Sequence, residues 1–174
     1  MFQSSFIIWI LPILFMIHDF EEIIMVRAWK KRHRKKFSSA KRPFFGNTTN
    51  TAAFSIAVLE EFLLLSGASF FTQSTENFSI YFSLFLAYTL HLFVHFLMSI
   101  KVKIYVPGLL TAILQFPLCC YLLLQLYKEI TDSSLTLLLT CIVCTILAFA
   151  NLLLLHRLME KFDAWLVQYG ARVN

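Results

Sequence analysis

The sequence predicts an all-α membrane protein, in which 174 residues form a single membrane-embedded domain, 1–174, built as a bundle of five transmembrane helices. Hydrophobic residues make up 59% of the chain and charged residues only 14%, whereas about a quarter of the residues in soluble domains are charged. Five apolar segments are long enough to cross a bilayer as helices. The basic residues, finally, collect in alternate connections between these segments, as expected for a multi-pass protein.

The five spans are expected, in chain order, near residues 5–26, 51–72, 78–100, 104–127 and 134–156. The first run lacks the basic start and the small-residue cleavage site of a signal peptide, so we interpret it as a retained span. A basic connector separates the first two spans, and short polar turns separate the others. The last segment is an amphipathic tail that is expected to continue the fifth helix along the membrane surface. The connector and the tail are residues 27–50 and 157–174.

The basic residues also predict the orientation. In the five-span arrangement all but one of the 15 Lys and Arg residues lie on the same side, and the exception is Lys128. Cytoplasmic loops are enriched in Lys and Arg, so the N-terminus is predicted outside and the C-terminus in the cytoplasm of a bacterial cell. The same residues explain the net charge of +5 through topology and anionic lipid headgroups. Membrane lipids are therefore expected partners, and nucleic acid is not.

Ionisable residues occur inside three of the predicted spans at a similar depth. They are His18, Glu21, Glu22, Glu60, Glu61, His91 and His95. In "IHDFEE", His18, Glu21 and Glu22 are spaced at i, i+3 and i+4, so they share one helix face. In "HLFVH", His91 and His95 are spaced at i and i+4 and share one face of their helix. Glu60 and Glu61 diverge by about 100° around their helix. One of them, for which we favour Glu60, is therefore expected to face the common centre.

This layer of ionisable residues indicates a metal site. A charged side chain at the centre of a membrane costs about 3 kcal/mol on the lowest scales, whereas hydrogen bonds between membrane helices contribute on average about 0.6 kcal/mol. Imidazoles and carboxylates suit transition metals better than calcium or magnesium. We predict a divalent transition metal, zinc favoured over iron or manganese. Its predicted ligands are His18, Glu22, Glu60, Glu61, His91 and His95.

Other polar residues near this layer have possible structural roles as well as functional ones. Asp19 lies off the HxxEE face and is expected to point to the headgroups or to Arg27. His156 is expected to anchor the end of the fifth span at the membrane surface. Asn151 either touches the site or bonds a neighbouring helix, and Tyr88 either supports a ligand or packs.

The stretch "HDFEE" resembles the signature of the HXXEE family of membrane proteins. Further landmarks are similar: the "EE" of the second span, "HLFVH" of the third and "YVPGLLTA" at the start of the fourth. The resemblance covers residues from about 10 to 157. It implies a small integral membrane protein with His and Glu motifs, and because the family is functionally undefined it implies no substrate.

The residues favour a membrane-embedded, metal-dependent enzyme, a hydrolase acting on a lipid or another apolar small molecule. The metal would lower the pKa of a bound water, and Glu21 or Glu22 would take the proton. One alternative is a di-iron or di-manganese oxidoreductase on the same ligands. Another is a small proton-coupled transporter, because intramembrane acids and histidines also form proton relays. A ligand-binding protein without catalysis is the third, and the sequence predicts no oligomeric state.

Overall fold

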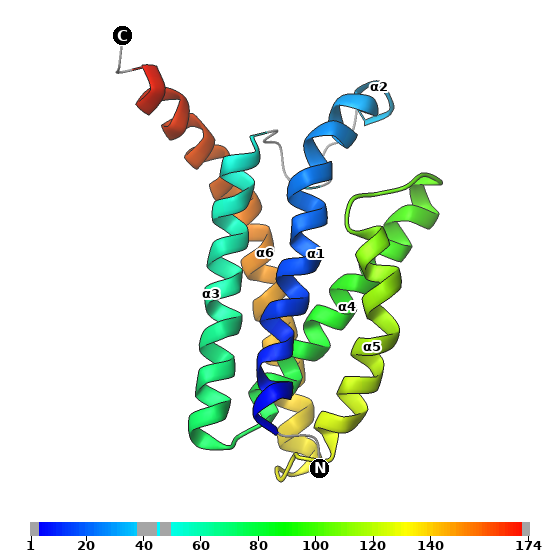
Figure 1. Cartoon of the computed structure of the whole chain (residues 1–174), viewed down its shortest axis with the longest axis vertical. Coiled ribbons are helices and arrows are strands. Elements are labelled where there is room, and N and C mark those ends of the chain that lie inside the picture. Colours follow the sequence, from blue (N-terminus) through cyan, green and yellow to red (C-terminus); the bar gives the residue numbers. More distant parts are fainter. Residues whose placement is uncertain (1–3, 38–44, 46–49, 172–174) are drawn as a thin grey trace.

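The computed structural model describes residues 4–37, 45 and 50–171, and within these ranges the chain forms helices and no strand. The helices are α1 (Ser4–Arg32), α2 (Arg34–Phe37), α3 (Thr51–Thr75), α4 (Ser79–Val102), α5 (Leu109–Tyr127) and α6 (Ser134–Ala171). All except the short α2 run up and down in one bundle (Figure 1). α1 packs against α3, α4 and α5, and α4 packs against α3, α5 and α6. The predicted all-α class is confirmed.

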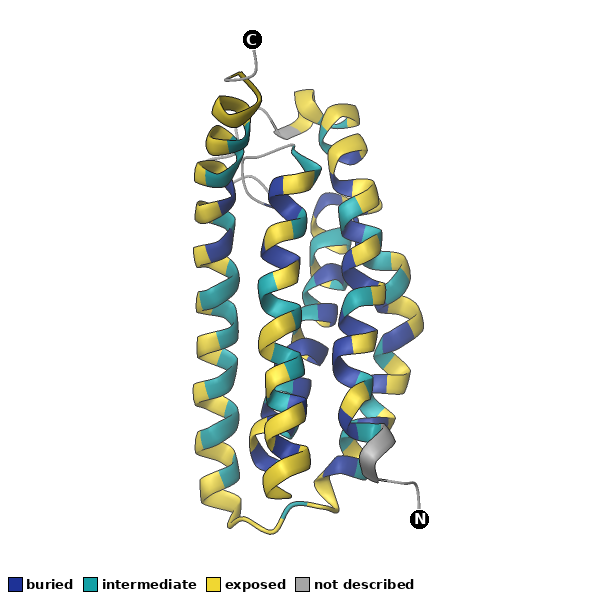
Figure 2. Ribbon diagram, turned by 60° about the vertical axis from the view of Figure 1, so that its left-hand side comes forward, coloured by how far each residue is buried: buried dark blue, intermediate teal, exposed yellow. Residues whose placement is uncertain are grey.

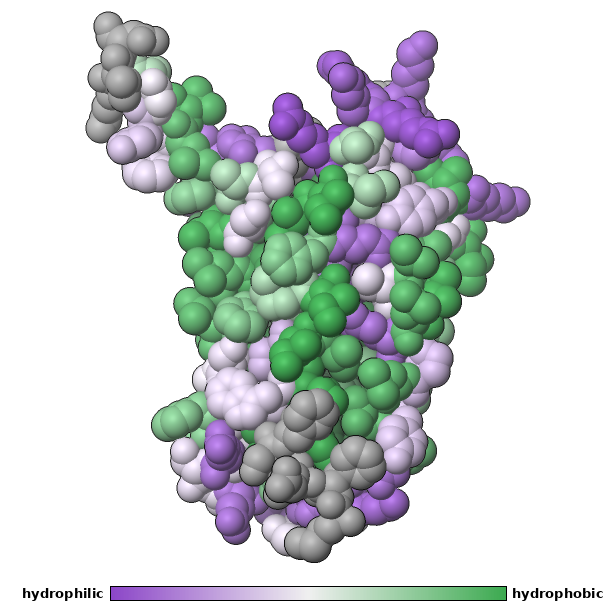
Figure 3. All heavy atoms as spheres, in the orientation of Figure 1, coloured by the Kyte–Doolittle hydropathy of each residue, from purple (hydrophilic) through white to green (hydrophobic). Residues whose placement is uncertain are grey.

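Four helices, α3, α4, α5 and α6, are long and apolar enough to cross a membrane. Large apolar side chains are exposed along them, and Figure 3 shows a hydrophobic band between two more hydrophilic ends. These helices indicate an integral membrane protein. α1, the first of the five predicted spans, is not among the four, and three acids stand in its apolar part: Asp19, Glu21 and Glu22. The number of five and the orientation stay predictions.

One boundary differs from the predicted one, and the predicted continuation of the last helix is present. The sequence predicts the fourth span from residue 104, but α5 begins at Leu109 because Gly108 has a left-handed backbone with φ of 82°, which a right-handed helix does not accommodate. α6 runs from Ser134 to Ala171 without a break, so the predicted tail continues the last helix as far as the structure describes it. Much of the basic connector, residues 38–44 and 46–49, lies outside the described residues, as do the last three residues of the tail.

Burial is unequal among the helices. Buried residues gather on the faces that α1, α4 and α5 turn toward the bundle (Figure 2). In α6, by contrast, the buried residues are Leu155 and Met159. The exposed surface of α6 is rich in leucine, isoleucine and valine, which suits a helix that faces lipid.

Two tyrosines of α4 set the height of α1. The Tyr81 hydroxyl donates to the Ile7 carbonyl oxygen (2.8 Å) and accepts from the Leu11 amide (3.2 Å), the two groups that an α-helix would pair with each other. Two turns further along, the Tyr88 hydroxyl has two acceptors for its one hydrogen, the Leu14 carbonyl oxygen (3.0 Å) and Gln115 Oε1 (2.6 Å). These contacts hold the HxxEE face of α1 opposite the histidines of α4.

Candidate metal centre

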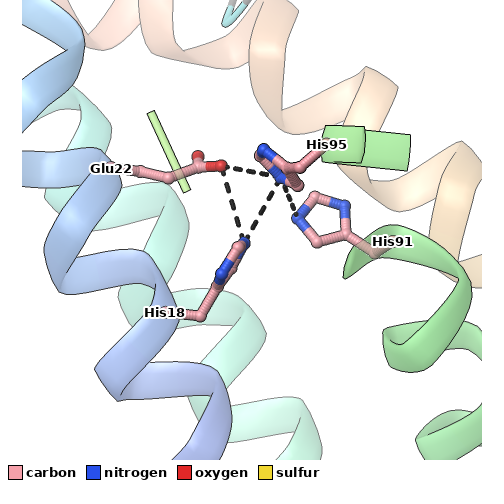
Figure 4. A group of neighbouring side chains, drawn as sticks. All are labelled: His18, Glu22, His91 and His95. Atoms are coloured by element: carbon pink, nitrogen blue, oxygen red, sulfur yellow. Dashed lines mark hydrogen bonds and ion pairs between the residues drawn. The ribbon is translucent and has the colours of Figure 1, made fainter. Parts of the chain in front are cut away.

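Four of the predicted residues meet between α1 and α4, and we call them the His/Glu group (Figure 4). His18 and Glu22 come from α1, and His91 and His95 come from α4, at i and i+4 in each helix. One ligand atom of each lies within 4.8 Å of the others. His18, Glu22 and His95 are buried, and His91 is half-buried. The i, i+4 spacing therefore places both pairs as the sequence predicts.

His95 Nε2 lies in the middle of the group. It is 3.3 Å from His18 Nε2, 3.1 Å from His91 Nε2 and 3.0 Å from Glu22 Oε1. His18 Nε2 is 3.7 Å from the same Glu22 oxygen. Four atoms that can each bind a metal thus point at one small volume.

The hydrogen of His95 is positioned by the loop between α4 and α5. His95 Nδ1 is 2.9 Å from the Pro107 carbonyl oxygen, which can only accept, so Nδ1 carries the hydrogen. In the neutral imidazole, Nε2 then carries a lone pair, which is directed at the ligand atoms of His18, His91 and Glu22. Metal-binding histidines show this arrangement, in which the outer nitrogen donates to a carbonyl or carboxylate and the inner nitrogen binds the metal.

The hydrogen of His18 is positioned in the same way through Thr111. His18 Nδ1 is 2.9 Å from Thr111 Oγ1, which is 2.6 Å from Glu21 Oε2. An ionised carboxylate only accepts, so the hydroxyl donates to Glu21 and accepts from His18 Nδ1–H. The Nε2 of His18 is therefore a second lone pair that faces the centre.

The group has the properties of a cation site. Glu22 Oε1 is buried and accepts no hydrogen bond from any described residue, and two imidazole nitrogens, which carry no hydrogen when their rings are neutral, lie within 3.7 Å. Lone pairs at such distances repel one another, and a buried carboxylate without a partner is costly. A cation between them removes both costs. Three imidazole nitrogens and one carboxylate oxygen fit zinc or another divalent transition metal, so the group could hold such an ion.

Gly108 leaves room for the group. A Cβ atom at this position would lie 2.7 Å from His95 Cε1 and 2.9 Å from Glu22 Oε1. Its positive φ of 82° also favours glycine. In the "PG" of "YVPGLLTA", Pro107 thus contributes the carbonyl oxygen that orients the His95 imidazole. Gly108, which has no side chain, leaves the space in which His95 and Glu22 lie.

Glu21 lies beside the group, at the N-terminus of α5. Its Oε1 accepts from the Leu110 amide (3.2 Å) and its Oε2 from the Thr111 amide (2.7 Å), and the Tyr105 hydroxyl donates to Oε1. Burial and this hydrogen bond raise the pKa of Tyr105 above its usual range, so the hydroxyl stays a donor. The free amides of a helix N-terminus favour a carboxylate. Glu21, predicted as one of two proton acceptors, is therefore placed next to the group and not in it.

A cavity of about 480 Å³ adjoins the group between α1, α3, α4 and α6. Glu22 and His91 reach it from the group, and most of its other lining residues are apolar. The polar residues that line it outside the group are Asp19, Glu61, Tyr88, Asn151 and His156.

The two glutamates of the second predicted span do not join the His/Glu group. Glu61 lines the cavity, whereas Glu60, which we favour from the sequence, is absent from its lining. Glu60 Oε2 instead accepts from Asn151 Nδ2 (3.0 Å), which links α3 to α6. The rotation of α3 in the bundle decides which neighbour faces inward, and spacing alone does not determine it.

Three residues have places that differ from the expected ones or were not foreseen. Asp19 is only 5% exposed and lines the cavity, so its predicted position at the headgroups or Arg27 is wrong. His156 lines the cavity as well, where the sequence favours a surface anchor. Sequence reasoning missed Thr111, and the available signal is a hydroxyl in an apolar run directly after "PGLL".

Comparison with known families finds a match to the family described as "Protein of unknown function with HXXEE motif", over residues 9–122. The matched region contains the whole His/Glu group together with Glu21 and Thr111, and it ends within α5. No curated protein matches the chain, and no solved structure matches it. The chain belongs to the family of proteins of unknown function that carry the HXXEE motif.

Proposed function

We propose that this protein is a metal-dependent hydrolase, embedded in a membrane, that acts on a lipid or lipid-like substrate. The observation that carries the proposal is the buried His/Glu group at the wall of a mostly apolar cavity. A catalytic metal needs a position open to water or substrate. Glu22 and His91 are the members of the group that reach the cavity, so a fifth position, added to the four protein ligands and open to water or substrate, would face the cavity.

The proposal includes α1 as the first of five spans, with the N-terminus outside and the C-terminus in the cytoplasm. α1 has 29 residues and a length of roughly 43 Å, more than the hydrocarbon thickness of about 30 Å. It runs beside α3 through the bundle (Figure 1). Its residues His18, Asp19 and Glu22 are buried among the other helices, so they need not face lipid.

The residues of the cavity support hydrolysis of an ester or amide. A divalent metal held by the group would supply a Lewis acid for the water or for the substrate carbonyl. Glu61 lines the cavity from α3 and stands outside the group, so we assign proton transfer to it. Its carboxylate takes a proton from the attacking water and gives it to the leaving oxygen or nitrogen as the C–O or C–N bond breaks. The apolar walls hold the acyl chain.

Release of palmitate from palmitoyl esters and amides by the detergent-purified protein tests this function. We expect Glu61→Gln to keep its metal and to lose about 10²- to 10⁴-fold in rate. Glu60→Gln is the matched control, because this neighbouring residue does not line the cavity. The control should keep both its metal and the wild-type rate of hydrolysis.

Hydrolysis that survives in both Glu61→Gln and His95→Ala contradicts the proposal. Two irons or manganese ions per chain together with oxygen consumption would replace it with the oxidoreductase. Proton-coupled flux through proteoliposomes of a metal-free protein would replace it with the transporter.

A further inference from the structure

One end of the cavity is apolar, and its polar residues lie further along, where Phe54, Val58, Leu155 and Met159 also line it. The apolar end lies toward the α3–α4 turn and is lined by Phe15, Leu64, Leu65, Ile80, Leu84 and Leu147. The polar residues follow further along the same helices, and roughly 16 Å of α4 separate Ile80 from His91. A cavity of about 480 Å³ whose lining extends over this length suits one extended apolar chain with its head at the His/Glu group.

Asp19 is a buried acceptor among the polar residues of the cavity. It is 5% exposed, and its Oδ2 accepts no hydrogen bond from any residue that the structure describes. A buried acceptor without a partner is costly, and this one lines the cavity. A ligand head that donates a hydrogen bond to Asp19 removes this cost.

The lining of the cavity disfavours an anionic head. It contains three carboxyl groups, those of Asp19, Glu22 and Glu61, and neither Lys nor Arg among the described residues. A phosphate or a free carboxylate would lie beside these acidic residues without a basic side chain to pair with, a juxtaposition that selects against it.

We infer that the cavity takes a single-chain amphiphile whose head donates hydrogen bonds and carries no negative charge, such as a long-chain amide of an amino alcohol. This inference rests on the proposed function for the place of the scissile bond and names the substrate class. The amide carbonyl lies at the His/Glu group, the donors of the head bind Asp19, and the chain extends toward Ile80.

Binding of three probes with the same palmitoyl chain, measured by rapid mixing before the amide is hydrolysed, tests the inference on the full-length, metal-loaded protein. The probes are N-palmitoylethanolamine, palmitic acid and palmitoyl lysophosphatidic acid. We expect the amide to bind at least about tenfold more tightly than either anion. Asp19→Asn and Glu61→Gln should each reduce the ratio between the affinity for the amide and the affinity for the anions. Glu129→Gln, on an exposed turn, is the control and should leave this ratio unchanged. Ala148→Trp, which fills the cavity from α6, should weaken all three probes.

Anions that bind as tightly as the amide, or binding that is unaffected by Ala148→Trp, overturn the inference. Metal content and hydrolysis are measured on the same preparation. A preference for the amide in a protein that holds no metal supports the substrate class and contradicts the proposed function. Metal-dependent hydrolysis without a preference among the probes overturns the substrate class alone.

Discussion

At the scale of single residues, the site depends on where two imidazole hydrogens lie. The Pro107 carbonyl holds the hydrogen of His95 on Nδ1, and Thr111 holds that of His18 on Nδ1. Both Nε2 lone pairs then face the buried oxygen of Glu22. The ligands are oriented by the surrounding protein, and this preorganisation lowers the cost of binding a metal.

Replacing Thr111 by Val keeps the shape of the side chain and removes the acceptor of His18 Nδ1–H. We expect metal affinity to fall about 10- to 100-fold, because the imidazole loses its fixed tautomer and orientation. Chelator competition on the purified protein measures the affinity, and Thr111→Ser should restore it. Thr140→Val, at a half-buried position of α6 away from the group, is the control, and equal affinities of the two valine variants would show that Thr111 does not orient His18.

At the scale of elements, the start of α5 connects the site to the bundle. Its N-cap residue, Gly108, offers no side chain to the free amides of the helix, and Glu21 of α1 supplies the carboxylate instead. The capping interaction therefore joins two helices and also orients Thr111 for His18. Of the two glutamates in the HxxEE motif, Glu21 thus caps α5, and Glu22 belongs to the His/Glu group.

Glu21→Ala removes this cap, and it should destabilise the metal-free protein by about 1 kcal/mol. Thermal unfolding in detergent measures the change. Removing the metal beforehand separates the loss of the cap from any loss of metal binding. Glu129→Ala is the matched control, and a Glu21→Ala variant no less stable than this control would refute the capping role.

At the scale of the whole molecule, hydropathy predicts five long helices, and the structure contains a long helix at each of the five places because apolar runs of this length have few other folds. The i, i+4 spacing predicts that His18 and Glu22 share a face, as do His91 and His95. Spacing does not predict how α3 is rotated, which depends on its packing with α1 and α6, and so Glu61 lines the cavity where Glu60 was favoured. The role of Gly108 is also beyond the sequence, because it depends on a contact between three separate segments.

The topology of α1 decides whether the site lies inside a five-span protein. If α1 crosses the membrane, single cysteines placed at residues 4 and 33 of a cysteine-free variant should be labelled from opposite sides by an impermeant maleimide. Residue 33 should be labelled from the same side as residue 169, near the end of α6. Labelling of residues 4 and 33 from one side would exclude α1 as a span.

The metal content of the folded protein tests the central claim most directly. Elemental analysis of the detergent-purified chain should give about one zinc or other transition-metal ion per chain. His95→Ala should lose it, because His95 Nε2 stands in the middle of the group, and His33→Ala, whose imidazole bonds the Trp29 carbonyl, should keep it. A folded wild-type protein that holds no more metal than His95→Ala would contradict the account.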